Sequence, residues 1–408
     1  MSNRWLLGMI TTLLFLSGVV SAQNKTERKA RQVISSEMSR LRVSQEKNTV
    51  GSRFCGAQHV MELKSFLDFA DTQDDGYKTM VYDFVESYMD KMIGEEGRVL
   101  GRVDSLNDLT DLMCGSLLFR VNDYSGKAKY RLAMDSLRKE IERQPRTVDG
   151  GFWPDSESKE QVWIDRLYYY APFYAEYAQW YESGEKRAMS MDDVEHQLCL
   201  AYNRTYCGRC NLLHHAWDAD TVSVWANPKN GRGDCVWGRA EGLYLMALID
   251  YLDVFEAKSS KYYSQEQGVI DSLVYIFQSL CSRMAELQSP ECFMWKQLPN
   301  DTVSAGNDFE SSVTAMMAYV FLKGSRMGFL DKYYQKAGTA ALRELEDRFV
   351  DADGDDGVIL DGASCDMRLR SDVKCDAATY IKALGAKNSE EALSSWIMAL
   401  TELSIIGK

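Results

Sequence analysis

The chain has little proline, and this leaves most of it free to form helices. Only six prolines stand among 408 residues, and a proline is the residue that most strongly breaks a helix interior. Several of them fall between segments of helical periodicity, at Pro145, Pro154, Pro290 and Pro299. The few breaks therefore predict long helices joined at these positions.

Two further deficits exclude classes of partner. After the N-terminus, the sequence has no apolar run near the roughly 20 residues that a membrane-spanning helix needs, so no membrane span is expected. Basic residues are outnumbered, 47 against 60 acidic ones, and the formal net charge is −13 at pH 7. An acidic protein repels polyanions, so nucleic acid is not an expected partner. An anionic substrate would need positive charge supplied locally by its site.

The cysteines form no recognisable metal framework. Cys207-Gly-Arg-Cys210 has the spacing of a redox or zinc motif, but it lacks a second cysteine pair and a thioredoxin-like βαβ setting. A disulfide or two buried thiols is the favoured interpretation, and a redox or metal role is the alternative. No metal and no organic cofactor is predicted.

The first 22 residues have the pattern of a secretory signal peptide. Arg4 precedes an apolar run from Trp5 to Leu16, and Val20-Ser21-Ala22 supplies small residues before an expected cleavage at Gln23. The protein is therefore expected to be exported, to the periplasm or the medium. No linker or low-complexity tract follows, which predicts one domain over residues 23–408.

Helical periodicity runs through nearly all of that domain. Apolar residues recur at three- and four-residue spacing in eight clear segments, which are 77–93, 128–143, 192–206, 236–255, 267–287, 309–327, 333–349 and 389–405. We expect about a dozen helices, paired as hairpins around an axis, in an all-α barrel whose longer loops gather function at one end. Short β-hairpins are expected near 221–227 and 357–360.

One stretch places a carboxylate among aromatic and aliphatic side chains. Asp165 stands within Gln161-Val-Trp-Ile-Asp-Arg-Leu-Tyr-Tyr-Tyr-Ala-Pro-Phe173, which we expect to form the opening turns of a helix continuing to about Ser183. An apolar surround disfavours the ionised carboxylate, which would make Asp165 a general acid. The alternative is that Asp165 caps the helix or pairs with a buried donor.

An ordered series of loop motifs connects this stretch to a known family. The motifs are Thr110-Asp111, Gln144-Pro-Arg-Thr147, Gly150-Gly-Phe-Trp153, Val162-Trp-Ile-Asp165, Ala171-Pro-Phe173, His215-Ala-Trp-Asp218, Trp225-Ala-Asn227, Trp237-Gly-Arg-Ala-Glu-Gly242 and Asp308-Phe-Glu-Ser-Ser312. This series resembles glycoside hydrolase family 105, the unsaturated rhamnogalacturonyl hydrolases, and the related unsaturated glucuronyl hydrolases of family 88. The similarity covers nearly all of the chain after residue 22.

The resemblance implies an (α/α)6 barrel that removes a 4,5-unsaturated uronate from the non-reducing end of lyase-generated oligosaccharides. In the family, the Asp at the position of Asp165 protonates C4 of the enol ether, and water adds at C5. Asp111 matches the second site Asp, which holds sugar hydroxyls and tunes the first carboxylate. His215 matches a histidine near the sugar. A charge at a helix N-terminus is the alternative for Asp111, and a structural role is the alternative for His215.

The same resemblance assigns the uronate pocket. Trp237 and Arg239 match a pair in which the indole offers a flat face to the sugar and the guanidinium binds its carboxylate. Trp163 and Trp153 are candidate substrate contacts, with core packing as the alternative. The chain departs from the family pattern at Pro154, Arg166 and Leu243, changes that spare the proton donor but alter the surrounding walls.

The expected partner is an unsaturated uronic-acid oligosaccharide, and the expected state is a monomer. Two other functions remain open at this stage. One is a non-catalytic glycan-binding helical protein. The other is an inverting hydrolase of saturated glycans on the same barrel, which would hold two carboxyl groups about 6.5–9.5 Å apart.

Overall fold

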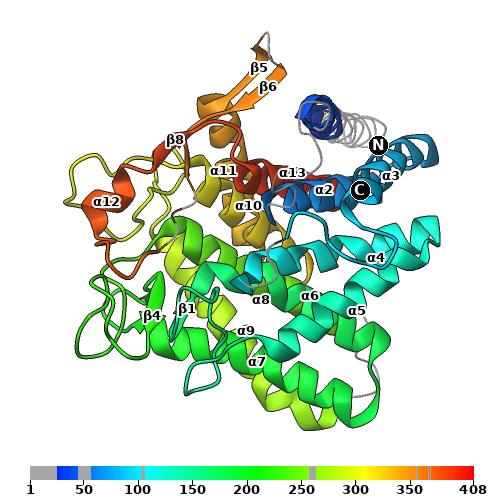
Figure 1. Cartoon of the computed structure of the whole chain (residues 1–408). Helices are drawn as coiled ribbons and strands as arrows, with labels where there is room; N and C mark the ends of the chain where they lie inside the picture. The colour runs from blue at the N-terminus through cyan, green and yellow to red at the C-terminus, as the bar shows by residue number, and fades with distance from the viewer. Residues whose placement is uncertain are drawn as a thin grey trace, which may run out of the picture.

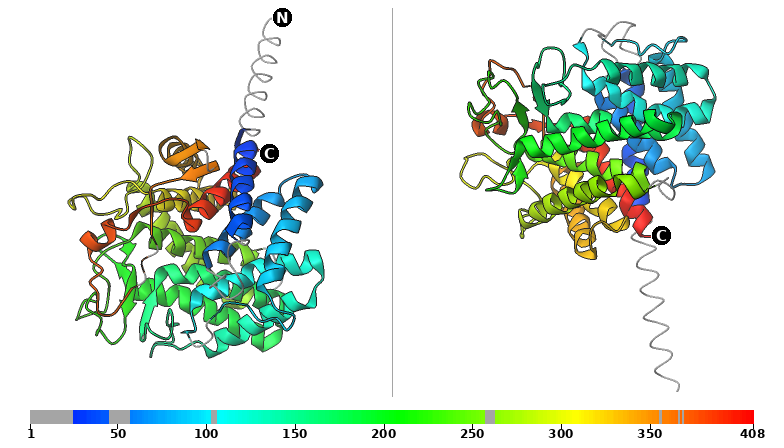
Figure 2. Two further views of the ribbon diagram at one scale, coloured as in Figure 1. Left: turned by 45° about the horizontal axis from the view of Figure 1, so that its top comes forward. Right: turned by 90° about the horizontal axis from the view of Figure 1, so that it is seen from below.

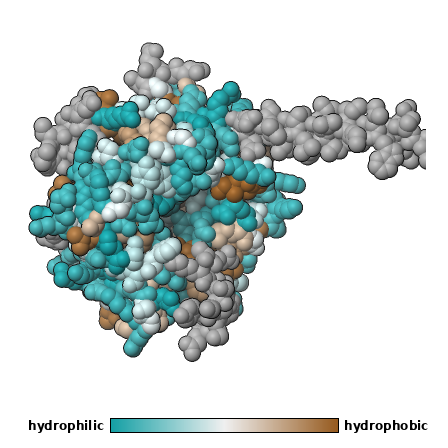
Figure 3. All heavy atoms as spheres, turned by 90° about the vertical axis from the view of Figure 1, so that its right-hand side faces the viewer, coloured by the Kyte–Doolittle hydropathy of each residue, from teal (hydrophilic) through white to brown (hydrophobic). Residues whose placement is uncertain are grey.

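The structure is a computed structural model that describes residues 25–44, 57–102, 106–256, 263–354, 357–365, 367 and 369–408. The predicted signal peptide and Cys55 lie outside these residues. Within them, none of the helices is both long and apolar enough to cross a bilayer. The face shown in Figure 3 is mostly hydrophilic, with small separate hydrophobic patches.

Two rings of helices alternate along the described part of the chain (Figure 1). The outer helices are 25–44, α3 (Asp75–Met92), α5 (Ala128–Arg143), α7 (Gly184–Thr205), α9 (Tyr263–Glu286) and α11 (Lys332–Phe349). The inner helices are α2 (Ala57–Ala70), α4 (Met113–Ser125), α6 (Leu167–Tyr181), α8 (Gly238–Glu256), α10 (Ser311–Arg326) and α13 (Glu390–Ile406). The predicted (α/α)6 barrel is thus confirmed.

The pattern of burial explains which helices form the inner ring and which form the outer ring. Helix α10 is buried on every side from Ser311 to Gly324, whereas α5 buries one stripe that includes Tyr130, Met134 and Leu137. A helix buried all round belongs inside, and an amphipathic helix covers the surface. Asp74 and Asp331 begin the outer helices α3 and α11 by accepting a hydrogen bond from a backbone N–H of the first turn.

The inner ring closes where the first and last helices meet. Each inner helix packs on the next, and α13 packs on both α10 and α2. Helix 25–44 lies beside the C-terminal helix (Figure 2), and the Ser404 hydroxyl donates to Glu27 across this contact at 3.1 Å. Because every inner helix follows an outer one, all inner helices run in the same direction. Their N-termini therefore lie at the same end of the barrel.

The helical segments predicted from periodicity are confirmed to within a few residues, except that α7 begins earlier, at Gly184. The stretch around Asp165 is not helical from its start. It forms β1 (Gln161–Trp163) and a 3₁₀ turn, η3 (Ile164–Arg166), before α6 begins. The apolar run suggested a helix there, but its β-branched and aromatic residues pair with a distant strand instead.

The remaining described strands are short antiparallel pairs. Strand β1 pairs with β4 (Ala216–Asp218), β2 (Tyr206–Cys207) with β3 (Leu212–Leu213), β5 (Val350–Gly354) with β6 (Gly357–Leu360), and β7 (Ala363–Ser364) with β8 (Leu384–Ala386). The hairpin predicted at 357–360 is confirmed. The one predicted at 221–227 is wrong, because this segment is an irregular loop of turns and bends.

Candidate active site

The predicted site residues gather at the N-terminal end of the inner ring. Asp111 lies in η2 (Leu109–Leu112) directly before α4, Asp165 lies in η3 before α6, and Arg239 lies in the first turn of α8. Positive partial charge collects at helix N-termini. The end that carries these residues therefore suits an anionic ligand in a protein that is acidic overall.

A short sheet brings two of them together. Strands β1 and β4 pair with Val162 opposite Trp217 and Trp163 opposite Ala216. Asp165 follows β1 and His215 precedes β4, so the pairing places them side by side, and the Ile164 N–H donates to the His215 carbonyl at 3.2 Å. About 50 residues of sequence separate the two positions, and this register joins them.

The Asp165 carboxyl group has one held oxygen and one free oxygen. Its Oδ2 lies 3.3 Å from Arg239 Nη2 and 3.6 Å from Arg166 Nη1. Its Oδ1 is buried and has no hydrogen-bond partner among the described residues. The purely apolar surround expected from the sequence is therefore wrong in one respect, since two guanidinium groups lie against the carboxylate.

Arg239 is the centre of a buried charge network. Its side chain is fully buried, and Nη1 donates to Glu391 Oε2 at 2.9 Å while Nη2 contacts Asp165. The Tyr169 hydroxyl donates to the same Glu391. The guanidinium that was predicted to bind a uronate thus holds two protein carboxylates, and its contact with substrate stays a prediction.

The rings of His215, Trp237 and Tyr380 form a continuous stack. The His215 and Trp237 centroids are 4.0 Å apart with planes 7° apart, and Trp237 and Tyr380 are 4.4 Å apart at 6°. Both faces of the indole are covered in this structure, one of them by Tyr380 of α12 (Ala377–Ile381). A sugar that uses the Trp237 face, as predicted, has to displace Tyr380.

His215 is fixed as a neutral imidazole. Its Nδ1 lies 2.9 Å from the Cys235 carbonyl oxygen, which only accepts, so Nδ1 carries the proton. Burial lowers the pKa of His215 to about 3, and its buried Nε2 has no partner in the described part of the chain. This lone pair can accept a hydrogen bond from a hydroxyl group. The His215 ring fits here because residue 233 is a glycine. A Cβ at Gly233 would lie 2.4 Å from His215 Cε1.

The other predicted residues lie around this centre with structural partners. Asp111 Oδ2 is 3.1 Å from Arg102 Nε. Trp163 is buried, and its indole N–H donates to Gln161 Oε1 at 2.8 Å. Trp153 is half-buried, and its indole nitrogen has no partner among described residues. Their roles in binding substrate stay predictions.

Sequence reasoning missed Glu391 and Tyr380. Glu391 stands beside Glu390 after Ser389, a pattern typical of ordinary acidic residues in the first turn of a helix. Tyr380 has no motif around it. Only closure of the barrel, which brings Glu391 against Arg239 and Tyr380 against Trp237, shows that both belong to this centre.

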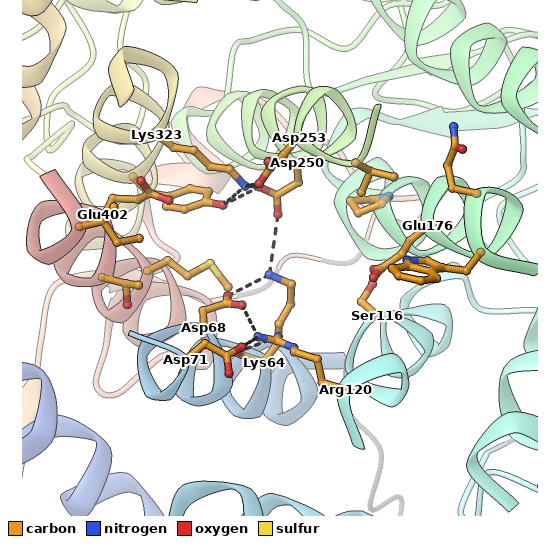
Figure 4. A pocket seen from close by; sticks show the side chains of 18 residues that line it. Lys64, Asp68, Asp71, Ser116, Arg120, Glu176, Asp250, Asp253, Lys323 and Glu402 are labelled. Carbon is orange, nitrogen blue, oxygen red and sulfur yellow. Dashed lines mark hydrogen bonds and ion pairs between the residues drawn. The ribbon is translucent and has the colours of Figure 1, made fainter. Parts of the chain in front are cut away.

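A cavity among the described residues lies elsewhere, at the opposite end of the barrel axis, and Figure 4 shows the side chains that line it. It has a volume of about 540 Å³ and is lined by all six inner helices of the described chain. Its central charges already pair with one another, since Lys64 lies 3.0 Å from Asp68 and Lys323 lies 2.8 Å from Asp250. It contains none of the predicted site residues, so this cavity is not the predicted site.

A comparison with known proteins agrees with the helical barrel and the motif order. The family model described as Glycosyl Hydrolase Family 88 matches residues 30–404, which is nearly the whole described chain. The chain belongs to glycosyl hydrolase family 88.

Known relatives of this family 88 protein fit that assignment. It is 30% identical over 173 residues to Protein Atu3128 of Agrobacterium fabrum, covering 42% of this chain and 68% of that protein. A glycoside hydrolase from family 105 of C. acetobutylicum ATCC 824 superposes with a TM-score of 0.78 at 26% identity, over 90% of this chain and 98% of that one. The unsaturated glucuronyl hydrolase of Bacillus sp. GL1 shares the fold, with a TM-score of 0.63 at 13% identity over 92% and 96%.

The positions where this family 88 chain departs from the motif pattern now have physical roles. The Pro154 carbonyl accepts from the Leu109 N–H at 3.0 Å and so joins the Trp153 loop to η2. Arg166 contacts Asp165, and its guanidinium carbon lies 5.1 Å from the Trp163 ring centroid. Leu243 is fully buried in α8. Arg166 is the departure that touches the predicted proton donor.

Proposed function

We propose that this family 88 glycosidase removes a 4,5-unsaturated uronate from the non-reducing end of lyase-generated oligosaccharides, most directly those of rhamnogalacturonan type. The observation that carries the proposal is the asymmetric environment of Asp165. One carboxylate oxygen is held by Arg239 and Arg166, and the other is buried without a partner among described residues. A carboxyl group held in this way has one oxygen free to carry a proton toward a substrate atom.

In the proposed reaction, Asp165 gives its proton to C4 of the enol ether while water adds at C5. The carboxylate left behind is stabilised by the two guanidinium groups that already contact it. The same carboxylate then accepts the proton released by the attacking water, so the donor is regenerated. The resulting hemiketal collapses, the ring opens, and the next sugar leaves.

Neighbouring residues supply orientation. The His215 Nε2 lone pair faces no partner in the described structure and accepts a hydrogen bond from a sugar hydroxyl or the attacking water. The helix N-termini at this end of the barrel favour the uronate carboxylate. The relative named as an unsaturated glucuronyl hydrolase supports this substrate class by its shared fold.

The test is turnover of unsaturated disaccharides, followed by loss of the ultraviolet absorbance of the conjugated uronate. Asp165→Asn keeps the shape and removes the acid, and we expect activity to fall by about 10²–10⁴-fold. Asp253→Asn is the matched control, because Asp253 is on α8 but lines the cavity at the opposite end. Unchanged turnover in correctly folded Asp165→Asn would refute the role of Asp165.

A further inference from the structure

A second cluster of ionisable side chains lies where the inner ring closes. His59 and Glu62 are one turn apart on α2, and Glu390 is the first residue of α13. His59 Nδ1 is 2.7 Å from Glu390 Oε1 and 3.8 Å from Glu62 Oε2. One potential ligand atom from each residue lies within 4.8 Å of the other two. The proposed reaction uses none of these residues.

The cluster is incompletely satisfied by its own members. Glu62 is 1% exposed, and its Oε1 has no hydrogen-bond partner in the described part of the protein. His59 is paired with Glu390 at 2.7 Å, and against the effect of burial its contacts with Glu390 and Glu62 raise the pKa of His59 to about 10. Burying a carboxylate is costly unless its oxygens have partners. An unpartnered oxygen on the buried carboxylate of Glu62, next to the His59–Glu390 pair, therefore points to a missing ligand.

The spacing and chemistry of the three groups suit a divalent metal ion. A tetrahedral zinc ion holds nitrogen and oxygen ligands at about 2.0–2.2 Å, which places the ligand atoms roughly 3.4 Å from one another. The separations of His59 Nδ1 from the two carboxylate oxygens, 2.7 and 3.8 Å, lie on either side of this value. A metal ion that displaces the His59 proton would have its charge of two balanced by the two carboxylates, and imidazole favours zinc-like ions over magnesium or calcium.

We propose that His59, Glu62 and Glu390 bind a divalent transition-metal ion of the zinc class. The site joins the first inner helix to the last, so the ion stabilises closure of the barrel. Glu390 also precedes Glu391, which holds Arg239. The metal thereby fixes the first turn of α13, on which the charge network around Asp165 depends. This inference does not rest on the proposed reaction.

The experiment measures zinc binding by the full chain after dialysis against a chelator. Equilibrium dialysis is expected to show one zinc ion per chain, with affinity weakened about a hundredfold or more in His59→Ala and in Glu390→Gln. His196→Ala is the matched control, because His196 is exposed on α7 and contacts the Asp149 carbonyl. Cys207→Ser is the second control, since Cys207 and Cys210 are free thiols. Both controls are expected to bind zinc as the parent protein does.

Two readouts independent of activity identify the site. Zinc at a hundred times its dissociation constant is expected to raise the thermal midpoint by roughly 3–5 °C in the parent protein and to leave His59→Ala unchanged. Cobalt substitution is expected to give visible d–d bands without a thiolate charge-transfer band. The absence of zinc binding, retention of full affinity in both site variants, or loss of binding in Cys207→Ser would each overturn the proposal.

Discussion

Replacement of Glu391 by Gln tests how the buried network sets the behaviour of the proposed acid. Glu391 balances the charge of Arg239, since its Oε2 lies 2.9 Å from Nη1 while Asp165 Oδ2 lies 3.3 Å from Nη2 of the same guanidinium. Glutamine keeps the shape and can still accept from Arg239 and Tyr169. It removes one negative charge, which leaves Arg239 free to stabilise ionised Asp165 more strongly.

The size of the effect follows from Coulomb's law. Two unit charges on opposite sides of a guanidinium group, on the order of 7 Å apart, interact by about 2 kcal/mol at an effective dielectric constant near 20. This equals one to two pH units, in round numbers. Ionised Asp165 cannot donate a proton, so the alkaline limb of the kcat/KM profile is expected to move to lower pH by about that amount.

The assay is turnover of an unsaturated disaccharide between pH 4 and 9, with intact folding checked at each end. Glu402→Gln is the control, because Glu402 is on the same helix but pairs with Arg326 and lines the opposite cavity. Its profile is expected to match that of the parent protein. If the alkaline limb of the kcat/KM profile of Glu391→Gln stays in place or moves to higher pH, the coupling between Glu391 and Asp165 is refuted.

Three further predictions concern stability. Burial raises the pKa of Glu241 to about 8. The folded state therefore binds more protons than the unfolded state between pH 4.5 and 8, and the free energy of unfolding falls as the pH rises through about this range. In urea titrations Glu241→Gln should flatten this fall and raise the free energy of unfolding at pH 8 by at most about 4 kcal/mol. Lys323→Met removes the ion pair at 2.8 Å from Asp250, which keeps Lys64 at 3.9 Å. We expect the free energy of unfolding to fall by about 1–3 kcal/mol in the same titration, and an unchanged value would contradict the reasoning. Gly115→Ala places a Cβ 2.3 Å from the Phe173 ring. We expect the free energy of unfolding to fall by about 1–3 kcal/mol and the thermal midpoint to fall with it. An unchanged midpoint would show that α4 and α6 move apart freely.

The proposed acid and the residues that hold it show different degrees of predictability. Asp165 could be found from the sequence because a lone carboxylate in an apolar stretch is chemically unusual, and the order of the loop motifs then identified the family. Glu391 and Tyr380 could not, because an acidic first turn and an isolated tyrosine are common in any helical protein. Their roles arise from contacts between residues more than 140 positions apart in the sequence, such as Arg239 with Glu391.

The sequence by itself determined the helices and their order along the chain, because three- and four-residue periodicity is a local property that each segment carries alone. It also determined which end of the barrel carries the chemistry, since Asp111, Asp165 and Arg239 stand just before or in the first turn of inner helices that share one direction. Only the tertiary structure decided how the charges pair. The β1–β4 register and the closure of α13 onto α2 and α10 set the distances among Asp165, Arg239 and Glu391. Those distances are fixed by long-range packing, on which short-range periodicity has no bearing.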